Sequence, residues 1–301
     1  MSGRTAKARR RQQVMQPKVT NGLARSGRAG RDDLAARAPW MSALKNKKVA
    51  LFGVGAIGCP AALELARCGL HELAVLDGDY LDPATACRWP LGIGYAGSPK
   101  VGVVQAVIGS NWPLTHVHPE LRQLGRIRQM GEEPEGAVLE RMLQNADLVV
   151  DATAEYGVSF LLSELARDRN LPYVAITAEH GVWGGTVLVV RPGKGGCWMC
   201  YQAAVVAGDI PRPPSDPAGL TQPEGCAAPT FSGASFELLP IVAEGVRVAV
   251  SILTAGEDVG YAHLGWDVAV GSLRTTTGQA IPWNWQTFQL RVHIGCPRCG
   301  Q

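Results

Sequence analysis

The sequence predicts an α/β fold with a doubly wound, mainly parallel sheet that continues into an antiparallel C-terminal part. Short apolar runs alternate with helical patterns through about residue 180, as they do in a parallel sheet with crossover helices. Beyond that point the pattern changes to longer strand-like runs, a proline-rich segment at 208–230 and a long apolar helix. With 301 residues, of which 46% are hydrophobic, the chain can bury one large core or two small ones.

The apolar runs place the elements along the chain. The parallel part is expected to contain strands at 49–52, 72–77, 115–121, 145–153 and 171–177 and helices at 59–68, 101–109 and 159–169. The later part is expected to contain strands at 183–191, 261–270 and 284–294 and a helix at 238–254. No run reaches the roughly 18 apolar residues of a membrane span and no secretory leader is evident, so we expect a cytoplasmic protein.

The first strand and its helix are joined by a glycine-rich turn with the pattern Gly53-x-Gly55-x-x-Gly58. In a Rossmann-like nucleotide-binding unit, the first glycine makes the turn and the second lets the backbone approach phosphates. The third lets the helix lie against the strand. The residues expected to bind a nucleotide here are Gly53, Gly55, Ala56, Ile57 and Gly58. The alternative is a glycine-rich turn kept only for packing.

Polar side chains follow the later strands at the same expected edge of the sheet. The second strand ends in Asp77, with Asp79 after it, roughly 20 residues past the glycines, where a carboxylate binds a ribose hydroxyl. Another strand ends in Asp151 and Thr153. Lys100 opens the helix after a proline, beside the edge where phosphates bind. These residues therefore extend the predicted nucleotide site, although an exposed lysine is the simpler alternative for Lys100.

Two Cys-x-x-Cys pairs, at Cys197 and Cys200 and at Cys296 and Cys299, predict a zinc site. Each pair places two thiolates on one side of a tight turn, and two pairs supply the four sulfurs of a tetrahedral site. A four-cysteine site has no open position, so the expected role is structural. Because the pairs lie far apart in the sequence, the metal would clamp the C-terminus to the middle of the chain. A redox pair or unrelated thiols are the alternatives.

Charge is distributed unevenly along the chain. Residues 1–48 hold 13 lysines and arginines and 2 acidic residues. The remaining residues hold 16 lysines and arginines and 24 acidic residues, so the N-terminal segment is basic and the rest of the chain is acidic. Residues 1–40 are rich in Arg, Ala, Gly and Gln and are expected to form a disordered basic tail before a fold spanning 41–301. Because no aromatic residues interleave the arginines, we interpret this tail as solvated and do not expect nucleic-acid binding.

Several motifs in this order resemble the ThiF/MoeB/HesA superfamily, the bacterial relatives of ubiquitin-activating enzymes. The resemblance covers residues 48–299 and rests on the glycine turn, Asp77-Gly-Asp79, Arg88, Gly97-Ser-Pro99-Lys100, Asp151-Ala-Thr153, both cysteine pairs, and the segment around Cys226 that precedes the long helix. It implies an adenylation domain with a nucleotide-binding half at about 41–180. The zinc clamp, a crossover loop and the C-terminal strands would occupy 181–301.

This resemblance implies ATP- and Mg²⁺-dependent adenylation of the C-terminal carboxylate of a ubiquitin-like or sulfur-carrier protein. Arg88 and Lys100 would stabilise the charge that develops on the phosphates, which is how such cations accelerate the reaction. Asp77 would bind the ribose, with Asp79 and Asp151 as orienting or metal-shell groups. A homodimer and a ubiquitin-conjugating-enzyme-like partner are the further expectations, and no membrane partner is expected.

Four departures from the family pattern bear on activity. Ala154 stands where the family has a magnesium-binding aspartate, and Glu155 is the candidate replacement. Thr85 and Trp89 replace an asparagine and a glutamine that flank Arg88. The N-terminal motif that supplies an arginine to the partner protomer's ATP is absent, and Arg37 is a weak substitute. These losses keep a non-catalytic nucleotide-binding scaffold open as an alternative.

Cys226 lies in the proline-rich segment, just before the long helix whose N-terminal dipole favours a thiolate. We expect it to accept the activated carboxylate as a thioester. The alternatives are an inert cysteine or one used only for sulfur transfer. Adenylation of a small peptide or a tRNA nucleoside, and an NAD-dependent oxidoreductase that shares only the glycine turn, are the rival functions.

Overall fold

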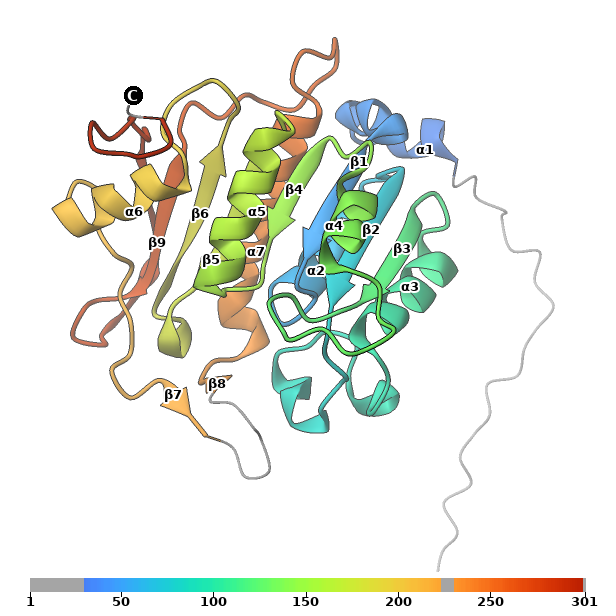
Figure 1. Ribbon diagram of the computed structural model, residues 1–301, viewed down its shortest axis with the longest axis horizontal. Coiled ribbons are helices and arrows are strands. Elements are labelled where there is room, and N and C mark those ends of the chain that lie inside the picture. The colour runs from blue at the N-terminus through green and yellow to red at the C-terminus, as the bar shows by residue number, and fades with distance from the viewer. Residues whose placement is uncertain (1–29, 223–229, 300–301) are drawn as a thin grey trace, which may run out of the picture.

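A computed structural model describes residues 30–222 and 230–299 (Figure 1). Its main feature is an eight-stranded sheet with the order β10-β9-β6-β5-β4-β1-β2-β3. The strands are β1 (Lys48–Phe52), β2 (Glu72–Asp77), β3 (His116–Leu121), β4 (Leu148–Asp151), β5 (Tyr173–Ala178), β6 (Gly184–Val190), β9 (Val268–Arg274) and β10 (Ala280–Phe288). Neighbours from β3 to β5 pair in parallel, and those from β5 to β10 pair antiparallel. The expected mainly parallel sheet with an antiparallel continuation is therefore confirmed.

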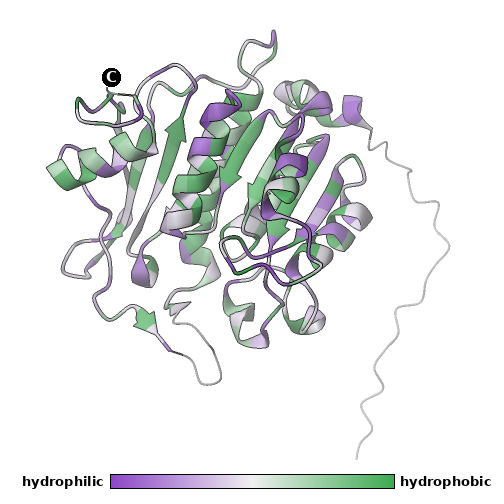
Figure 2. Ribbon diagram, in the orientation of Figure 1, coloured by the Kyte–Doolittle hydropathy of each residue, from purple (hydrophilic) through white to green (hydrophobic). Residues whose placement is uncertain are grey.

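Helices cover both faces of this sheet, so the fold has three layers (Figure 1). The helices α2 (Gly58–Arg67), α3 (Lys100–Asn111) and α7 (Ser235–Leu253) pack on one face. The opposite face carries α4 (Glu135–Leu143), α5 (Tyr156–Asp168) and α6 (Trp198–Ala207). Alternate residues of one strand supply the two cores, as Leu51 and Phe52 of β1 show. Figure 2 shows the result, with apolar strands at the centre and hydrophilic residues on the outer helices.

Short elements complete the chain at the ends of the sheet. They are α1 (Arg31–Ala35), the 3₁₀ helices η1 (Pro39–Asn46), η2 (Pro83–Cys87), η3 (Ile93–Tyr95) and η4 (His180–Val182), and the hairpin strands β7 (Leu220–Thr221) and β8 (Thr230–Phe231). Residues 30–40, the last part of the expected tail, are described, and Arg31 there donates hydrogen bonds to the carbonyls of Gly69 (2.7 Å) and Leu114 (3.0 Å). Residues 1–29 of the expected tail lie outside the described residues. No helix in the described part of the chain is long and apolar enough to cross a membrane.

The parallel strands lie close to their expected positions, but three later features differ. The C-terminal strands span 268–274 and 280–288 rather than 261–270 and 284–294. The turn between them is closed by a hydrogen bond from the Thr275 amide to the Gln279 carbonyl (2.9 Å), which fixes the register. Helices α4 and α6 were not expected. Helix α6 is apolar on most sides, so its sequence lacks the two-faced pattern that indicates a surface helix.

Candidate active site

A cavity of about 280 Å³ lies beside the turns that follow β1, β2 and β4. Its walls come from segments far apart in the sequence, and it is lined by Gly55, Ala56, Ile57, Asp79, Thr85, Arg88, Trp89, Lys100, Ala152, Thr153, Ala154, Thr230 and Phe231. Parallel strands direct their carboxyl ends to one edge of a sheet, which is where ligands bind in open α/β folds. Residues that separate motifs predict for a nucleotide site thus line a single cavity.

The three glycines of the turn have different surroundings. Gly53 has a φ of 80°, and a Cβ there would lie 2.8 Å from the Ala152 carbonyl oxygen. A Cβ on Gly58 would lie 1.8 Å from the Gly53 carbonyl oxygen, so only glycine lets helix α2 begin this close to β1. Gly55 has no atom within 4 Å of its ideal Cβ and lines the cavity. The first and third glycines therefore set the packing, and the second leaves space for a ligand.

Asp77 and Asp79 occupy different positions at the end of β2. The Asp77 carboxylate accepts hydrogen bonds from the Val54 and Asp79 amides (both 2.8 Å), which braces the glycine turn. Burial raises the pKa of Asp77, while Lys100 and these amides oppose that effect. Asp79 lines the cavity and forms an ion pair with Lys100, with 2.5 Å between Oδ2 and Nζ. Asp77 is absent from the lining, so Asp79 is the carboxylate nearer the space for a ligand.

Lys100 is a largely buried cation, with 11% of its side chain exposed. It begins α3, and its backbone amide donates to the Asp79 carbonyl (3.0 Å), which fixes the start of the helix beside β2. A buried ammonium needs a partner because the desolvation of a charge is costly. Asp79 supplies one partner, and the remaining donors lie at the wall of the cavity. An exposed surface lysine, the simpler alternative, does not describe this residue.

Asp151 belongs to the core beneath the cavity rather than to its lining. The side chain is 1% exposed. One oxygen accepts from the amide (2.9 Å) and hydroxyl (2.7 Å) of Thr153, and the other accepts from Ser159 (2.5 Å) and Tyr173 (2.7 Å). Burial and the nearby Asp151 charge raise the pKa of Tyr173 well above its usual value. Asp151 therefore orients Thr153, which does line the cavity.

Arg88 closes another wall of the cavity through contacts with β8. Its guanidinium donates to the Phe231 carbonyl (2.5 Å) and to the Thr230 hydroxyl, and its Cζ lies 4.5 Å from the centre of the Phe231 ring. Trp89 donates from its indole nitrogen to the Val54 carbonyl (2.9 Å). Thr230, Phe231 and Trp89 were not expected to contribute to the site. Because they meet Arg88 and Val54 across long sequence separations, no local pattern indicates these contacts.

Ala154 and Glu155 follow Thr153 where the magnesium ligand is expected. Ala154 has a φ of 56°, in the left-handed region that Asp and Asn enter more readily than alanine. It lines both the nucleotide cavity and a second, adjoining cavity of about 920 Å³. Glu155 is exposed and lines only the second cavity. The Glu155 carboxylate is thus one residue away from Ala154, but it borders the second cavity and does not line the nucleotide cavity.

The second cavity joins the first along Ile57, Thr153, Ala154, Thr230 and Phe231. Its other walls come from α5, β5, β6, α6 and the segment before β7. It contains Glu179, whose pKa is raised by burial, and the cation Arg212. Tyr156 and Trp198 add an aromatic wall, with ring centroids 4.5 Å apart. The two cavities together can accommodate a nucleotide and the end of a second substrate.

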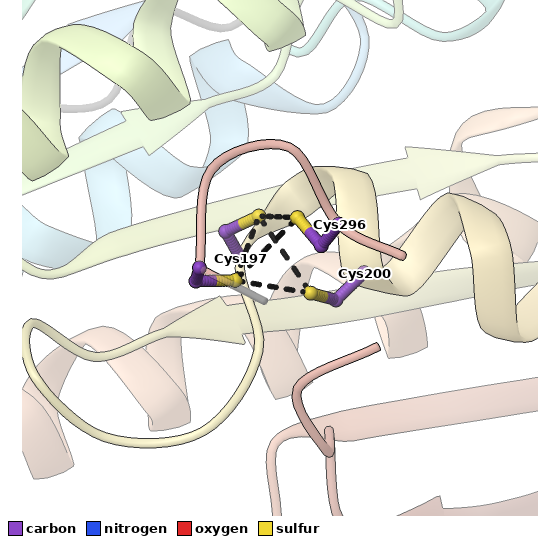
Figure 3. Close-up of side chains that lie close together, drawn as sticks. Cys197, Cys200 and Cys296 are labelled. Carbon is purple, nitrogen blue, oxygen red and sulfur yellow. Dashed lines mark hydrogen bonds between the residues drawn. The ribbon is translucent and has the colours of Figure 1, made fainter. Parts of the chain in front are cut away.

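The four predicted zinc ligands lie together at the opposite end of the sheet, near the start of α6 and the C-terminus (Figures 1 and 3). All four sulfur atoms lie within 4.8 Å of one another. Five of the pairwise distances run from 3.2 to 3.8 Å. Four thiolates about 2.3 Å from a zinc ion would be separated by about 3.8 Å, so the arrangement fits tetrahedral zinc.

Two further candidate residues, Cys226 and Arg37, are predicted from the sequence. Cys226 lies outside the described residues, between β7 and β8, so its role stays a prediction. Arg37 is exposed, donates to the Asp33 carbonyl of its own turn (2.9 Å) and does not line the described nucleotide cavity. Among the described residues we therefore assign no arginine that would reach a nucleotide bound to a second protomer.

Comparisons with known proteins find a family and several relatives for this chain. The ThiF family model matches residues 28–244. The uncharacterized protein y4oA of Sinorhizobium fredii is 34% identical over 275 residues, which cover 89% of this chain and 45% of y4oA. Ubiquitin-like modifier-activating enzyme 5 of Drosophila melanogaster is 27% identical over 202 residues, which cover 63% of this chain and 47% of that enzyme. The chain thus spans about half the length of the curated relatives it matches.

Solved structures show the same fold at low sequence identity. E. coli MccB, solved with ATP, superposes with a TM-score of 0.63 at 15% identity, over 87% of this chain and 69% of MccB. PaaA superposes with a TM-score of 0.58 at 17% identity, over 83% of this chain and 66% of PaaA. The match of the family model across most of the chain identifies the chain as a member of the ThiF family.

Proposed function

We propose that this chain activates a carboxylate by ATP-dependent adenylation. The observation that carries the proposal is the nucleotide cavity, where the open glycine turn meets Lys100, Arg88 and Thr153. A glycine turn that opens a helix binds phosphates through backbone N–H groups, and two cations beside it complement a triphosphate. The family membership and the similarity to MccB, which has been solved with ATP, support the same nucleotide.

In the proposed reaction an oxygen of the substrate carboxylate attacks the α-phosphorus of ATP. The bond to the β-phosphate oxygen breaks, and the products are an acyl-adenylate and pyrophosphate. Negative charge grows on the transferred phosphate and the leaving group, so cations fixed at the cavity wall stabilise the transition state more than the ground state. Lys100 and Arg88 have this role in the proposal. Asp77 or the cavity-lining Asp79 binds the ribose.

Mg²⁺, when bound with ATP, would neutralise charge on the leaving pyrophosphate. The oxygen groups available for the metal and its waters are the Thr153 hydroxyl and the Glu155 carboxylate, which border the joined cavities. Zn²⁺ belongs to the four-cysteine site in this proposal. Its role is structural because all four positions of the tetrahedron are taken by thiolates.

The second cavity is the proposed entrance for the carboxyl end of the other substrate. A ubiquitin-like or sulfur-carrier protein is the first candidate, as the name of the similar Drosophila enzyme suggests. A short peptide is the second candidate, because the cavity of about 920 Å³ leaves room for a terminal residue with a side chain. MccB, whose fold this chain shares, has been solved with N-formylated MccA. A homodimer and a ubiquitin-conjugating-enzyme-like partner stay part of the proposal.

Nucleotide binding is the direct test of this proposal. Isothermal titration calorimetry should show binding of MgATP and little binding of NAD, because two cations face the expected phosphates. Lys100→Ala should weaken ATP binding about tenfold or more, as expected for a lost hydrogen bond to a charged group. Lys194→Ala, an exposed lysine outside this cavity, is the matched control. Preferential binding of NAD, or normal ATP binding by Lys100→Ala, would contradict the assignment.

The fate of the adenylate is tested separately through Cys226. If a thioester forms, Cys226→Ala should retain ATP–pyrophosphate exchange with a carrier protein but lose a thiol-sensitive covalent adduct on a non-reducing gel. An active wild-type chain that never forms the adduct would favour direct transfer from the adenylate. Loss of both activities in Cys226→Ala would indicate a structural cysteine.

A further inference from the structure

Arg88 is held by two neighbouring residues that lie 142 and 143 positions later in the sequence. Thr230 accepts a hydrogen bond from its guanidinium through the side-chain oxygen, and Phe231 accepts one through the backbone carbonyl. The Phe231 ring also lies under the guanidinium, 4.5 Å from Cζ. All three residues line the nucleotide cavity. The contacts therefore restrict a long cationic side chain at the place where phosphates are expected.

The β7–β8 hairpin holds Thr230 and Phe231 in turn. Thr221 and Thr230 are paired across the hairpin, and the Thr221 hydroxyl donates to the Thr230 carbonyl (3.3 Å). Phe231 packs against the core cluster that includes α2 and α7. Its ring therefore contacts both the core of the fold and the Arg88 guanidinium.

A guanidinium has five N–H donors, and the described contacts use two of its nitrogens with one bond each. The remaining donors make no further hydrogen bond to the described residues and can bind phosphate oxygens. An unrestrained arginine loses rotamer entropy when it is fixed. A side chain that is already held has less to lose when a nucleotide binds, and such preorganisation increases affinity.

We propose that Thr230 and Phe231 are positioning residues that hold Arg88 over the nucleotide cavity in the orientation that binds the ATP phosphates. This inference rests on the proposed function, and it adds that the hairpin and the phosphate-binding cation act as one unit. The alternative is that the same contacts only attach the hairpin to the fold. If the two residues position Arg88, substituting them weakens binding of ATP only while Arg88 is present and only for ligands that carry phosphates. If they only attach the hairpin, their substitution does not depend on Arg88 or on the phosphates.

The experiment measures the dissociation constants of ATP and adenosine by calorimetry for single and double variants. Phe231→Leu removes the aromatic face, and Phe231→Tyr keeps it. Thr230→Val removes the hydroxyl acceptor, and Thr230→Ser keeps it. Thr276→Val is the control, since Thr276 is exposed in the turn between β9 and β10 and lines neither described cavity. Thermal melting checks that each variant is folded.

We expect Phe231→Leu and Thr230→Val each to weaken ATP binding about three- to tenfold, the range that corresponds to a lost cation–π contact or hydrogen bond. Adenosine binding should be unchanged, since adenosine has no phosphate. Phe231→Tyr, Thr230→Ser and Thr276→Val should bind ATP like the wild type. In an Arg88→Ala background, Phe231→Leu should have no further effect, because the two residues act through one contact.

Equal losses of ATP and adenosine affinity would overturn the inference, as would an undiminished effect of Phe231→Leu in the Arg88→Ala background. If Phe231→Leu lowers the melting temperature, the ATP affinities of Thr230→Val and Thr230→Ser decide between the two hypotheses, because these substitutions change the side-chain volume less. A wild-type chain that binds ATP no better than adenosine would contradict the proposed function itself and this inference with it. That outcome is visible before any variant is measured, so the two failures are distinguishable.

Discussion

Gly55 and Gly58 differ in what an added methyl group would contact. At Gly58 an added Cβ would meet the Gly53 carbonyl oxygen at 1.8 Å, whereas at Gly55 it would meet nothing within 4 Å. We expect Gly58→Ala to lower the free energy of unfolding by about 1–3 kcal/mol, the usual cost of overpacking. Gly55→Ala should leave it unchanged but weaken ATP binding, because the methyl group occupies the approach to the phosphates. Urea unfolding and calorimetry measure the two effects.

The pair serves as its own control because both substitutions alter the same motif. Loss of stability in Gly55→Ala would show that the position serves packing alone, the alternative left open for the glycine turn. A Gly58→Ala variant with wild-type stability would show that the start of α2 shifts without cost.

Asp151 offers a second test at the scale of one residue. Its four hydrogen-bond donors are all buried or partly buried. Asp151→Asn replaces one acceptor oxygen with a donor that faces other donors, so we expect a loss of about 1–3 kcal/mol in unfolding free energy. Tyr173→Phe removes a single donor and should cost less. A variant Asp151→Asn with full stability and lost Mg²⁺-dependent ATP binding would instead place Asp151 in the metal shell.

Glu155 and Ala154 test the metal assignment. We expect Glu155→Gln to reduce the gain in ATP affinity that Mg²⁺ provides, because a carboxylate is a better Mg²⁺ ligand than an amide. The measurement is the dissociation constant of ATP with Mg²⁺ and with EDTA. Glu140→Gln on α4, outside both described cavities, is the control. Equal Mg²⁺ dependence in the wild type and Glu155→Gln would exclude Glu155.

Ala154→Asp restores the residue that the family resemblance leads us to expect. Its left-handed φ of 56° suits aspartate, so the variant should fold normally. If Glu155 already supplies the carboxylate, activity should stay unchanged or fall. A large gain in activity on Ala154→Asp would show that the site has lost its metal ligand without replacement.

At the scale of residues, the sequence indicated the parts of the site whose chemistry is local. The glycine turn and Lys100 are recognisable because each lies at a fixed offset from a strand or a helix start. The contacts that complete the site are not local. Thr230 lies 142 residues after Arg88, and β4, β5 and β6 lie between them in the sequence, so no local spacing could predict their contact.

The cysteine cluster joins two elements, the start of α6 and the segment after β10. We expect one zinc ion per chain in protein purified without chelator, and elemental analysis measures it. Cys296→Ser should lower the zinc content and the stability, because the C-terminal segment loses its link to α6. Hydrogen exchange should then increase in β10 more than in β1, since β10 is the edge strand beside the clamp.

Cys87→Ser is the matched control for this prediction, because Cys87 is exposed and outside the cluster. Less than about half an equivalent of zinc in the wild type would count against the metal site. Retained zinc in Cys296→Ser would point to another ligand set.

At the scale of elements, the parallel strands β1, β2, β4 and β5 could be predicted because each is a short apolar run that is mostly buried. The edge strand β10 alternates between exposed and half-buried residues, so its limits are weakly marked. Helix α4 has buried residues at Val138, Leu139, Met142 and Leu143, a helical spacing that could have revealed it. Helix α6 offers no such spacing.

At the scale of the whole molecule, the basic N-terminal segment is chemically distinct from an acidic remainder. Residues 1–29 contain 8 lysines and arginines and no acidic residue. The first described contact between this end of the chain and distant residues is made by Arg31, which donates to the carbonyls of Gly69 and Leu114. The core residues described on both faces of the sheet all lie at Trp40 or later in the sequence.

Deletion of residues 1–29 should therefore leave the melting temperature and the ATP dissociation constant unchanged. Arg31→Ala is the contrasting variant, since it removes two hydrogen bonds to backbone carbonyls and should cost about 1–3 kcal/mol. Differential scanning calorimetry and nucleotide titration measure both. The deletion also tests whether an arginine of this segment, in place of Arg37, reaches the partner protomer's ATP. If truncation weakens ATP binding and a full-length chain with Lys100→Ala restores binding when mixed with it, then an N-terminal arginine acts across a dimer, and the segment belongs to the active site.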